Sequence, residues 1–128
     1  MKNKDIYKSA LSLISQDPSK DNNEDLAERA PYFLAAFCNE VKELDDRMRR
    51  ILNIPEADDF DGVFLSLDKE FPLLDRFASV AAKYLAAMLM IDEDSELSDK
   101  LYALYCDGIS LIQKEIPSAI EKIIDKYL

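Results

Sequence analysis

The sequence predicts a single all-helical domain, a bundle of about five helices, and three observations support this fold class. The chain of 128 residues contains only two glycines and five prolines, far fewer than a turn-rich β protein needs. Hydrophobic residues make up 48% of the chain and charged residues 33%, a balance typical of a globular protein with a core. Apolar residues recur at helical spacing along most of its length. A chain of this size forms one domain, which we expect to span residues 1–128.

The first helix is predicted over residues 3–15, because apolar residues recur at helical spacing between Ile6 and Ile14. The segment QDPSKDNN follows, and its Pro, Asp and Asn residues favour a turn. A basic cluster accompanies this helix: Lys2, Lys4 and Lys8. We expect a solvated helix face there, with contact to an acidic partner or DNA as the alternative.

The second helix is predicted from near Glu24 to Leu52. Pro31 lacks an amide donor, so it either kinks this helix or marks its first turn. Three acid-before-base pairs four residues apart favour a helix over a strand: Glu43 with Arg47, Asp45 with Arg49, and Asp46 with Arg50. The apolar stripe consists of Phe33, Leu34, Phe37, Val41, Leu44, Met48 and Leu52.

A long loop is predicted over NIPEADDFDG, whose composition breaks helices. Its carboxylates Asp58, Asp59 and Asp61 lie close together, but the spacing of a calcium-binding EF-hand loop is not met. We therefore expect a solvated loop. For the following segment, VFLSLDKEFPLL, we expect one or two short helical turns.

The next helix is predicted to start near Pro72, which suits a first helical turn, and to be the centre of the bundle. It is apolar on nearly every side, so it either occupies the middle of the domain or buries a second face against another subunit. Its small residues permit close approach of neighbouring helices. The residues expected to face inward are Leu74, Phe77, Ala78, Ala81, Leu85, Met88 and Leu89, and the small ones on the remaining girth are Ala82, Ala86 and Ala87.

The acidic run after this helix is predicted to be a turn in which Asp94 or Ser95 caps the next helix. That helix carries the apolar stripe Leu97, Leu101, Leu104, Tyr105, Ile109, Leu111 and Ile112. Gly108 in its middle indicates a close crossing or a kink. Pro117 is expected to end it and to start a short, easily displaced terminal helix over residues 117–128.

The composition excludes several kinds of chemistry. Without histidine the chain cannot build a Ser-His-Asp or Cys-His catalytic site. Cys38 and Cys106 lie far apart in apolar patterns, so we expect two buried, reduced thiols. The net charge of -10 repels a phosphate backbone. We expect no cofactor, no small-molecule ligand, no membrane contact, and a cytoplasmic location, because no targeting segment or glycine-rich phosphate loop is evident.

Two carboxylate pairs are the strongest catalytic candidates. Glu40 with Glu43 and Glu96 with Asp99 each lie three residues apart, on one helical face, and together could offer oxygen ligands to Mg²⁺. This spacing resembles the ExxE and ExxD arrangement of all-helical nucleotide pyrophosphohydrolases. The basic phosphate-binding residues of that family are not evident, so we predict no catalytic or metal site and keep this enzyme class as a remote alternative.

The order of apolar motifs resembles the small all-helical head-tail connector, or adaptor, proteins of tailed phages and prophages. The motifs are ALSLI, ERAPYFLAAFCNEV, LSLDKEFPL, YLAAMLMIDED and ELSDKLYALY, and the similarity as a whole extends over residues 6–112. The resemblance implies a virion assembly protein that forms a ring beneath the portal and joins the DNA-filled head to the tail. It also implies contacts with copies of itself and with portal or tail proteins, with DNA only as passing cargo. The location it implies is the cytoplasm during assembly and the virion afterwards.

On this resemblance, apolar helix faces join neighbouring subunits and acidic side chains keep the channel from binding DNA. The predicted subunit-interface residues are Ala82, Ala86, Met90, Ile120 and Ile124. The competing function is an acidic helical regulatory module that binds a basic protein. It explains the net charge directly but does not explain the alanine-rich helix.

Overall fold

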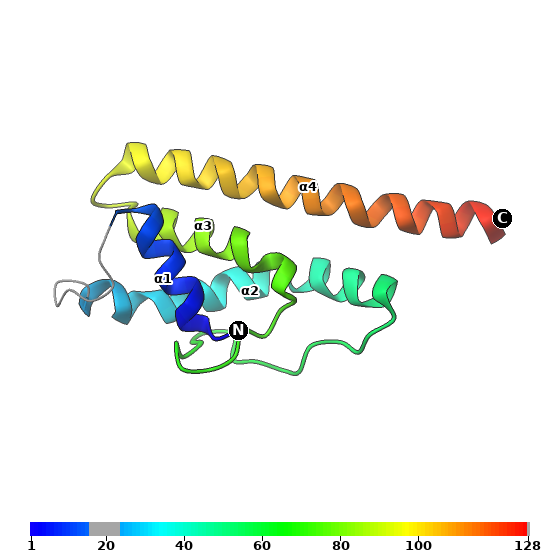
Figure 1. The fold of residues 1–128 in the computed structure, drawn as a ribbon, viewed down its shortest axis with the longest axis horizontal. Coiled ribbons are helices and arrows are strands. Elements are labelled where there is room, and N and C mark those ends of the chain that lie inside the picture. The colour runs from blue at the N-terminus through cyan, green and yellow to red at the C-terminus, as the bar shows by residue number, and fades with distance from the viewer. Residues whose placement is uncertain (16–23, 128) are drawn as a thin grey trace.

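The computed structural model describes residues 1–15 and 24–127, with side chains for residues 1–15 and 24–116. Within these ranges the chain is all-helical and contains no strand, which confirms the predicted class. Its four α-helices are α1 (Asn3–Leu13), α2 (Glu24–Leu52), α3 (Ala78–Leu89) and α4 (Ser95–Tyr127), and a single 3₁₀ turn, η2 (Asp75–Phe77), precedes α3. Figure 1 shows α4 along one side of the bundle, α2 on the other, and α1 crossing in front.

Helix α3 is the centre of the bundle, as predicted. It packs against α1, α2 and α4, and its alanines are buried among them. Because alanine side chains are small, all three neighbours can approach the α3 backbone closely. The apolar surface of α3 is therefore covered on several faces by helices of the same chain. Its buried residues are Val80, Ala81, Ala82, Leu85, Ala86, Ala87 and Leu89.

Helix α2 passes through Pro31, which is buried with helix on both sides of it. The interpretation of Pro31 as a first helical turn is therefore wrong. Its carbonyl oxygen accepts a hydrogen bond from the Leu65 amide at 3.1 Å, which fastens the long loop to α2. Of the three predicted ion pairs, Glu43 with Arg47 (2.9 Å) and Asp45 with Arg49 (2.8 Å) are present, whereas Asp46 pairs with Lys42 at 3.1 Å.

The segment between α2 and η2 contains no helical turn of the kind predicted there, and the next α-helix begins at Ala78 instead of near Pro72. The reason lies at Leu74, whose backbone is extended (φ -61°, ψ 147°). Its amide donates a hydrogen bond to Asp45 Oδ1 at 2.9 Å, so the chain is held in this conformation by α2. The helix can start only after that attachment.

Asp45 is the fixed point of this attachment. Its side chain is fully buried, and its second oxygen accepts a hydrogen bond from Arg49 Nε at 2.8 Å. Arg49 also donates to the carbonyl oxygens of Pro55 (3.1 Å) and Pro72 (3.4 Å). One turn of α2 therefore holds both ends of the loop.

The N-terminus is tied to the same loop. The Met1 amino group contacts Glu70 at 3.0 Å, and the Met1 carbonyl accepts a hydrogen bond from the Phe71 amide at 2.8 Å. The Asn3 amide donates to the Lys69 carbonyl at 2.9 Å. These contacts set the start of α1 against the loop.

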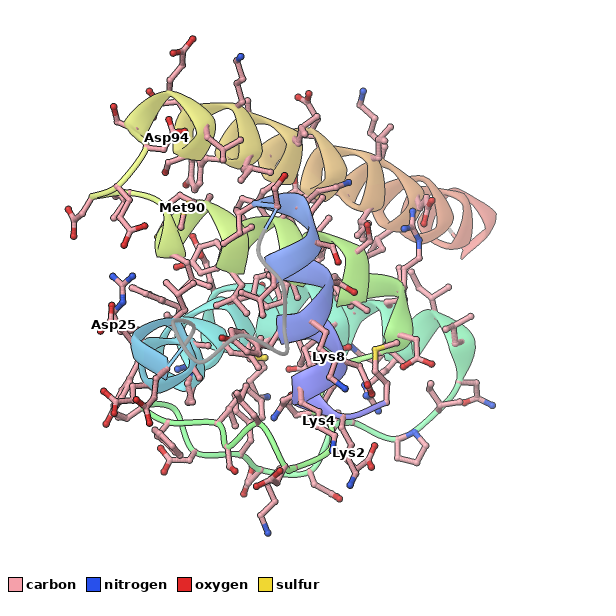
Figure 2. The ribbon with its side chains drawn as sticks, turned by 60° about the vertical axis from the view of Figure 1, so that its left-hand side comes forward. Lys2, Lys4, Lys8, Asp25, Met90 and Asp94 are labelled. Carbon is pink, nitrogen blue, oxygen red and sulfur yellow. The ribbon has the colours of Figure 1, made fainter. Side chains whose placement is uncertain are left out.

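The acidic turn caps α4, as predicted. Asp94 Oδ1 accepts a hydrogen bond from the Leu97 amide at 3.1 Å, while the Asp94 amide donates to the Met90 carbonyl at 2.9 Å. Figure 2 shows Met90 at the end of α3 and Asp94 at the start of α4. Ser98 then donates to the Ala87 carbonyl at 2.7 Å, a buried bond that fixes α4 to α3.

Helix α4 continues through Pro117 to Tyr127, so the prediction of a separate terminal helix is wrong. Residues 1–15 and 24–127 form four α-helices instead of about five. Proline removes one backbone hydrogen bond, and a helix already anchored over several turns can carry that loss. The anchors include buried Ile112 and Ile116 and the ion pair between Glu115 and Arg76 at 2.9 Å.

Gly108 marks a close crossing of α3 and α4, one of the two predicted alternatives. A Cβ atom placed on Gly108 would lie 2.5 Å from Val80 Cγ1. This is well inside van der Waals contact, so glycine is required for the observed approach.

We predict that Asp45→Ala lowers the free energy of unfolding by about 3 kcal/mol, because it leaves the half-buried Arg49 guanidinium without its buried carboxylate partner. Urea denaturation monitored by circular dichroism measures this change. Glu43→Ala is the matched control, since it removes an equally spaced but exposed pair and should cost less than ~1 kcal/mol. Equal losses for the two variants would contradict the role assigned to Asp45.

A second prediction concerns Gly108→Ala. Alanine raises helix propensity by about 1 kcal/mol, but overpacking against Val80 costs about 1–3 kcal/mol, so we expect a net loss of stability. In a Val80→Ala background the same change should become stabilising, because the obstructing methyl groups are gone. Thermal unfolding of the four proteins tests this reversal, and the same sign in both backgrounds would refute the close crossing.

Candidate functional site

The structure does not bring the four carboxylates of the two predicted pairs into one site. Glu43 is engaged by Arg47 at 2.9 Å, and Glu96 lies 4.0 Å from Lys100. The other member of each pair, Glu40 on α2 and Asp99 on α4, lines one shared cavity. No group of three or more possible metal ligands occurs among the described residues. The described residues therefore do not assemble the four-carboxylate arrangement that was considered, as a remote alternative, for Mg²⁺.

The shared cavity has a volume of about 380 Å³ and lies where α2, α3 and α4 meet. We call it the aromatic-carboxylate pocket. Ser98, whose hydroxyl bonds to α3, also borders it. The other residues that line the aromatic-carboxylate pocket are Glu40, Tyr84, Met88, Ile91, Asp99 and Tyr102.

Stacked aromatic side chains form one wall of this pocket. Tyr84 on α3 and Tyr102 on α4 both contact Tyr105, with ring centroids 5.2 and 5.5 Å apart. The Phe37 ring of α2 packs against two of these tyrosines, with its centroid 5.7 Å from that of Tyr84 and 6.0 Å from that of Tyr105. Edge-to-face and tilted contacts at these distances are favourable, so the rings support one another. Tyr84 is therefore supported by both Phe37 and Tyr105, and Tyr102 by Tyr105.

The negative charge of Glu40 raises the pKa of all three tyrosines of this cluster, Tyr84, Tyr102 and Tyr105. Burial raises the pKa of Tyr84, and the carboxylate of Glu40 raises it further. The same two causes raise the pKa of Tyr105. The pKa of Tyr102 is raised first by the Cys106 thiol, then by burial and by Glu40. A negative charge close to each phenol disfavours phenolate, which raises the pKa of each tyrosine further above physiological pH, where the rings are neutral.

The two carboxylates of the pocket have no cationic partner within the described part of the chain, unlike Asp45, Asp46 and Glu43 on α2. Sequence spacing singled out Glu40 and Asp99, but only as metal ligands. No functional role was predicted for Tyr84 or Tyr102. The signal that could have found the pocket is the i,i+3 step from Asp99 to Tyr102, which places acid and ring on one face of α4.

A larger cavity of about 810 Å³ lies along the loop between α2 and η2. It is bordered by Asp58, Asp59 and Asp61, the residues considered for calcium. Asp61 Oδ1 accepts a hydrogen bond from the Val63 amide at 2.8 Å, so this carboxylate shapes the loop itself.

Three of the five predicted interface residues lie where side chains are described, and none of these three is exposed. Ala82, Ala86 and Met90 are buried by neighbouring elements of the same chain, so a subunit contact made without rearrangement uses other residues. The side chains of Ile120 and Ile124 lie outside those described. By contrast, two residues of the apolar stripe predicted for α4 are exposed to solvent: Leu104, with 50% of its surface accessible, and Leu111, with 60%. They are seven residues apart and therefore share one face.

The lysine cluster lies along α1 and the residue before it (Figure 2). Lys2 and Lys8 are exposed and Lys4 is half-buried, an arrangement expected of a solvated helix face.

The two cysteines differ in their surroundings, which corrects the prediction that both are buried. Cys38 is fully buried, and burial together with the charge of Asp45 raises its pKa to about 12. Cys106 is exposed on α4 because its position falls outside the stripe that packs on α3.

Comparison of the chain with protein-family models, with curated proteins and with solved structures found no match. Over the described residues, no helix combines the length and apolar character needed to cross a bilayer.

We predict that a thiol reagent such as DTNB modifies one cysteine in the folded protein and two after denaturation. The thiolate is the reactive form, and Cys38 is both inaccessible and held protonated. Absorbance of the released thiolate gives the count, and Cys106→Ser should abolish the fast reaction. Rapid labelling of Cys38 in that variant would contradict the buried position.

Proposed function

We propose that this chain is a non-enzymatic assembly subunit, a head-tail connector that forms a ring around the DNA channel of a phage or prophage particle. The observation that carries the proposal is helix α4. Figure 1 shows its C-terminal part extending past the ends of the other helices. A long helix that leaves its own domain offers a surface on which a neighbouring subunit can pack.

The exposed face of α4 supplies the apolar contact for this proposal. Leu104 and Leu111 are each at least half exposed on the part of α4 that lies beside α3. In a heterologous interface this face meets a different surface of the next subunit, and repetition of that contact closes a ring. Ile120 and Ile124, which share the same helix, remain predicted members of the interface.

The charge of the chain suits a channel through which DNA passes. A net charge of -10 repels phosphates and prevents tight binding of the moving DNA. The acidic residues Asp92, Glu93, Asp94 and Glu96 concentrate this charge at the turn between α3 and α4.

An acidic regulatory module that binds a basic protein is the second candidate, favoured by the unpaired carboxylates Glu40 and Asp99. The two candidates differ in their assembly. A regulatory module stays a monomer or dimer, whereas a connector subunit forms closed rings with its portal.

We predict that multi-angle light scattering over a concentration series detects oligomers, and that negative-stain images with the candidate portal show rings. The double variant Leu104→Asp with Leu111→Asp should shift the population to monomer, because charge is costly in an apolar interface. Ile120→Asp with Ile124→Asp should have the same effect.

Ser110→Asp is the matched control, since it adds charge at an exposed α4 position between the two leucines. It should assemble like the parent chain. A parent chain that stays monomeric at every concentration and does not bind the portal would refute the connector proposal.

A further inference from the structure

We propose that the aromatic-carboxylate pocket binds the guanidinium group of an arginine side chain carried by a segment of a partner protein. The inference rests on the pocket alone and not on ring formation. It assigns a specific ligand to a cavity whose carboxylates have no internal partner.

The pocket presents negative charge from two directions. Glu40 comes from α2 and Asp99 from α4, and both are exposed residues with no cation paired to them in the described part of the chain. Most acidic residues of the neighbouring α2 surface are already paired, as the bonds of Glu43 and Asp46 show. Charge left unpaired at a cavity, between two packed helices, is available to a cation from outside.

The tyrosine rings select the kind of cation. Tyr84 and Tyr102 line the same cavity as the carboxylates, and their rings are fixed through Tyr105. A cation placed over such a ring is attracted by its π electrons, and arginine is the residue most often found there. The planar guanidinium can also donate hydrogen bonds in two directions, which suits two carboxylates on different helices.

Apolar residues cover the remaining side of the pocket. Met88 is half-buried and Ile91 is 52% exposed at the end of α3. They can pack on the methylene stem of arginine while its head reaches the carboxylates. A metal ion would find no such match, because two carboxylates among apolar and aromatic side chains offer too few oxygen ligands for Mg²⁺ or Ca²⁺.

Charge around the pocket favours a basic protein segment as the occupant. The neighbouring turn between α3 and α4 carries the exposed residues Asp92, Glu93 and Asp94. The pocket therefore lies in a negative field that raises the rate of encounter with a basic partner. A polyphosphate or nucleic acid would be repelled.

The test uses the blocked tripeptide Gly-Arg-Gly and the folded full-length chain, followed through the tyrosine ring resonances in NMR spectra. Titration should produce saturable shifts at Tyr84 and Tyr102. Tyr32 is an internal reference, because it packs on Phe64 away from the pocket and should not shift. The peptide with citrulline in place of arginine has the same shape without the charge, and should bind at least about tenfold more weakly.

Variants assign the effect to named residues. Glu40→Gln should weaken peptide binding by about fivefold to tenfold, since it removes one charged acceptor. Glu43→Gln lies three residues further along the same helix, outside the pocket, and should bind like the parent chain. Tyr102→Leu should weaken binding as well, through loss of the ring.

Equal binding of the arginine and citrulline peptides would overturn the proposal, as would equal effects of Glu40→Gln and Glu43→Gln. Shifts confined to tyrosines outside the pocket would also overturn it. Because Glu40 is exposed, its variant should keep the parent's thermal unfolding profile, so the test remains decisive if Tyr102→Leu does not fold. If the chain assembles into rings of subunits with its portal but does not bind the arginine peptide, this site is rejected and the connector proposal stands.

Discussion

The fold depends on one buried carboxylate. Asp45 lies inside the bundle, bonded to Arg49 on its own helix and to the Leu74 amide at the far end of the loop. An unpaired charge there would be very costly, so the loop must return to this point for the domain to be stable. The return places η2 and the start of α3 beside α2, and every later packing contact follows from that placement.

The alanines of α3 determine how close the other helices come. With buried small residues on several sides, α3 accommodates α1, α2 and α4 around it, and Gly108 lets α4 cross near Val80. This close approach brings Tyr105 of α4 against Tyr84 of α3 and against Phe37 of α2. The aromatic-carboxylate pocket is a consequence of the crossing, since its two carboxylates come from helices on either side of α3. The function proposed for this pocket is recognition of a guanidinium cation.

Much of the fold could be predicted from local pattern. Apolar spacing predicts the approximate bounds of α1 and α2 and the central position of α3. The cap at Asp94 follows from the preference of aspartate for accepting hydrogen bonds at a helix N-terminus. Errors arose where a local rule competed with a distant contact. Pro72 suited a helix start, but Asp45 holds the neighbouring backbone extended. Pro117 suited a helix end, yet α4 continues through it from a well-anchored first half.

The sequence by itself determined the helical class, the absence of histidine chemistry and the acidic charge, because these depend on composition and on contacts within a few residues. Only the tertiary structure decided which side chains meet. It left Glu43 with Arg47 and Glu96 near Lys100, placed Glu40 and Asp99 in one pocket beside Tyr84, and left Leu104 and Leu111 exposed. A small rotation of a helix about its axis moves such residues between core and surface, and that rotation is determined by packing across the bundle and not by spacing along the chain.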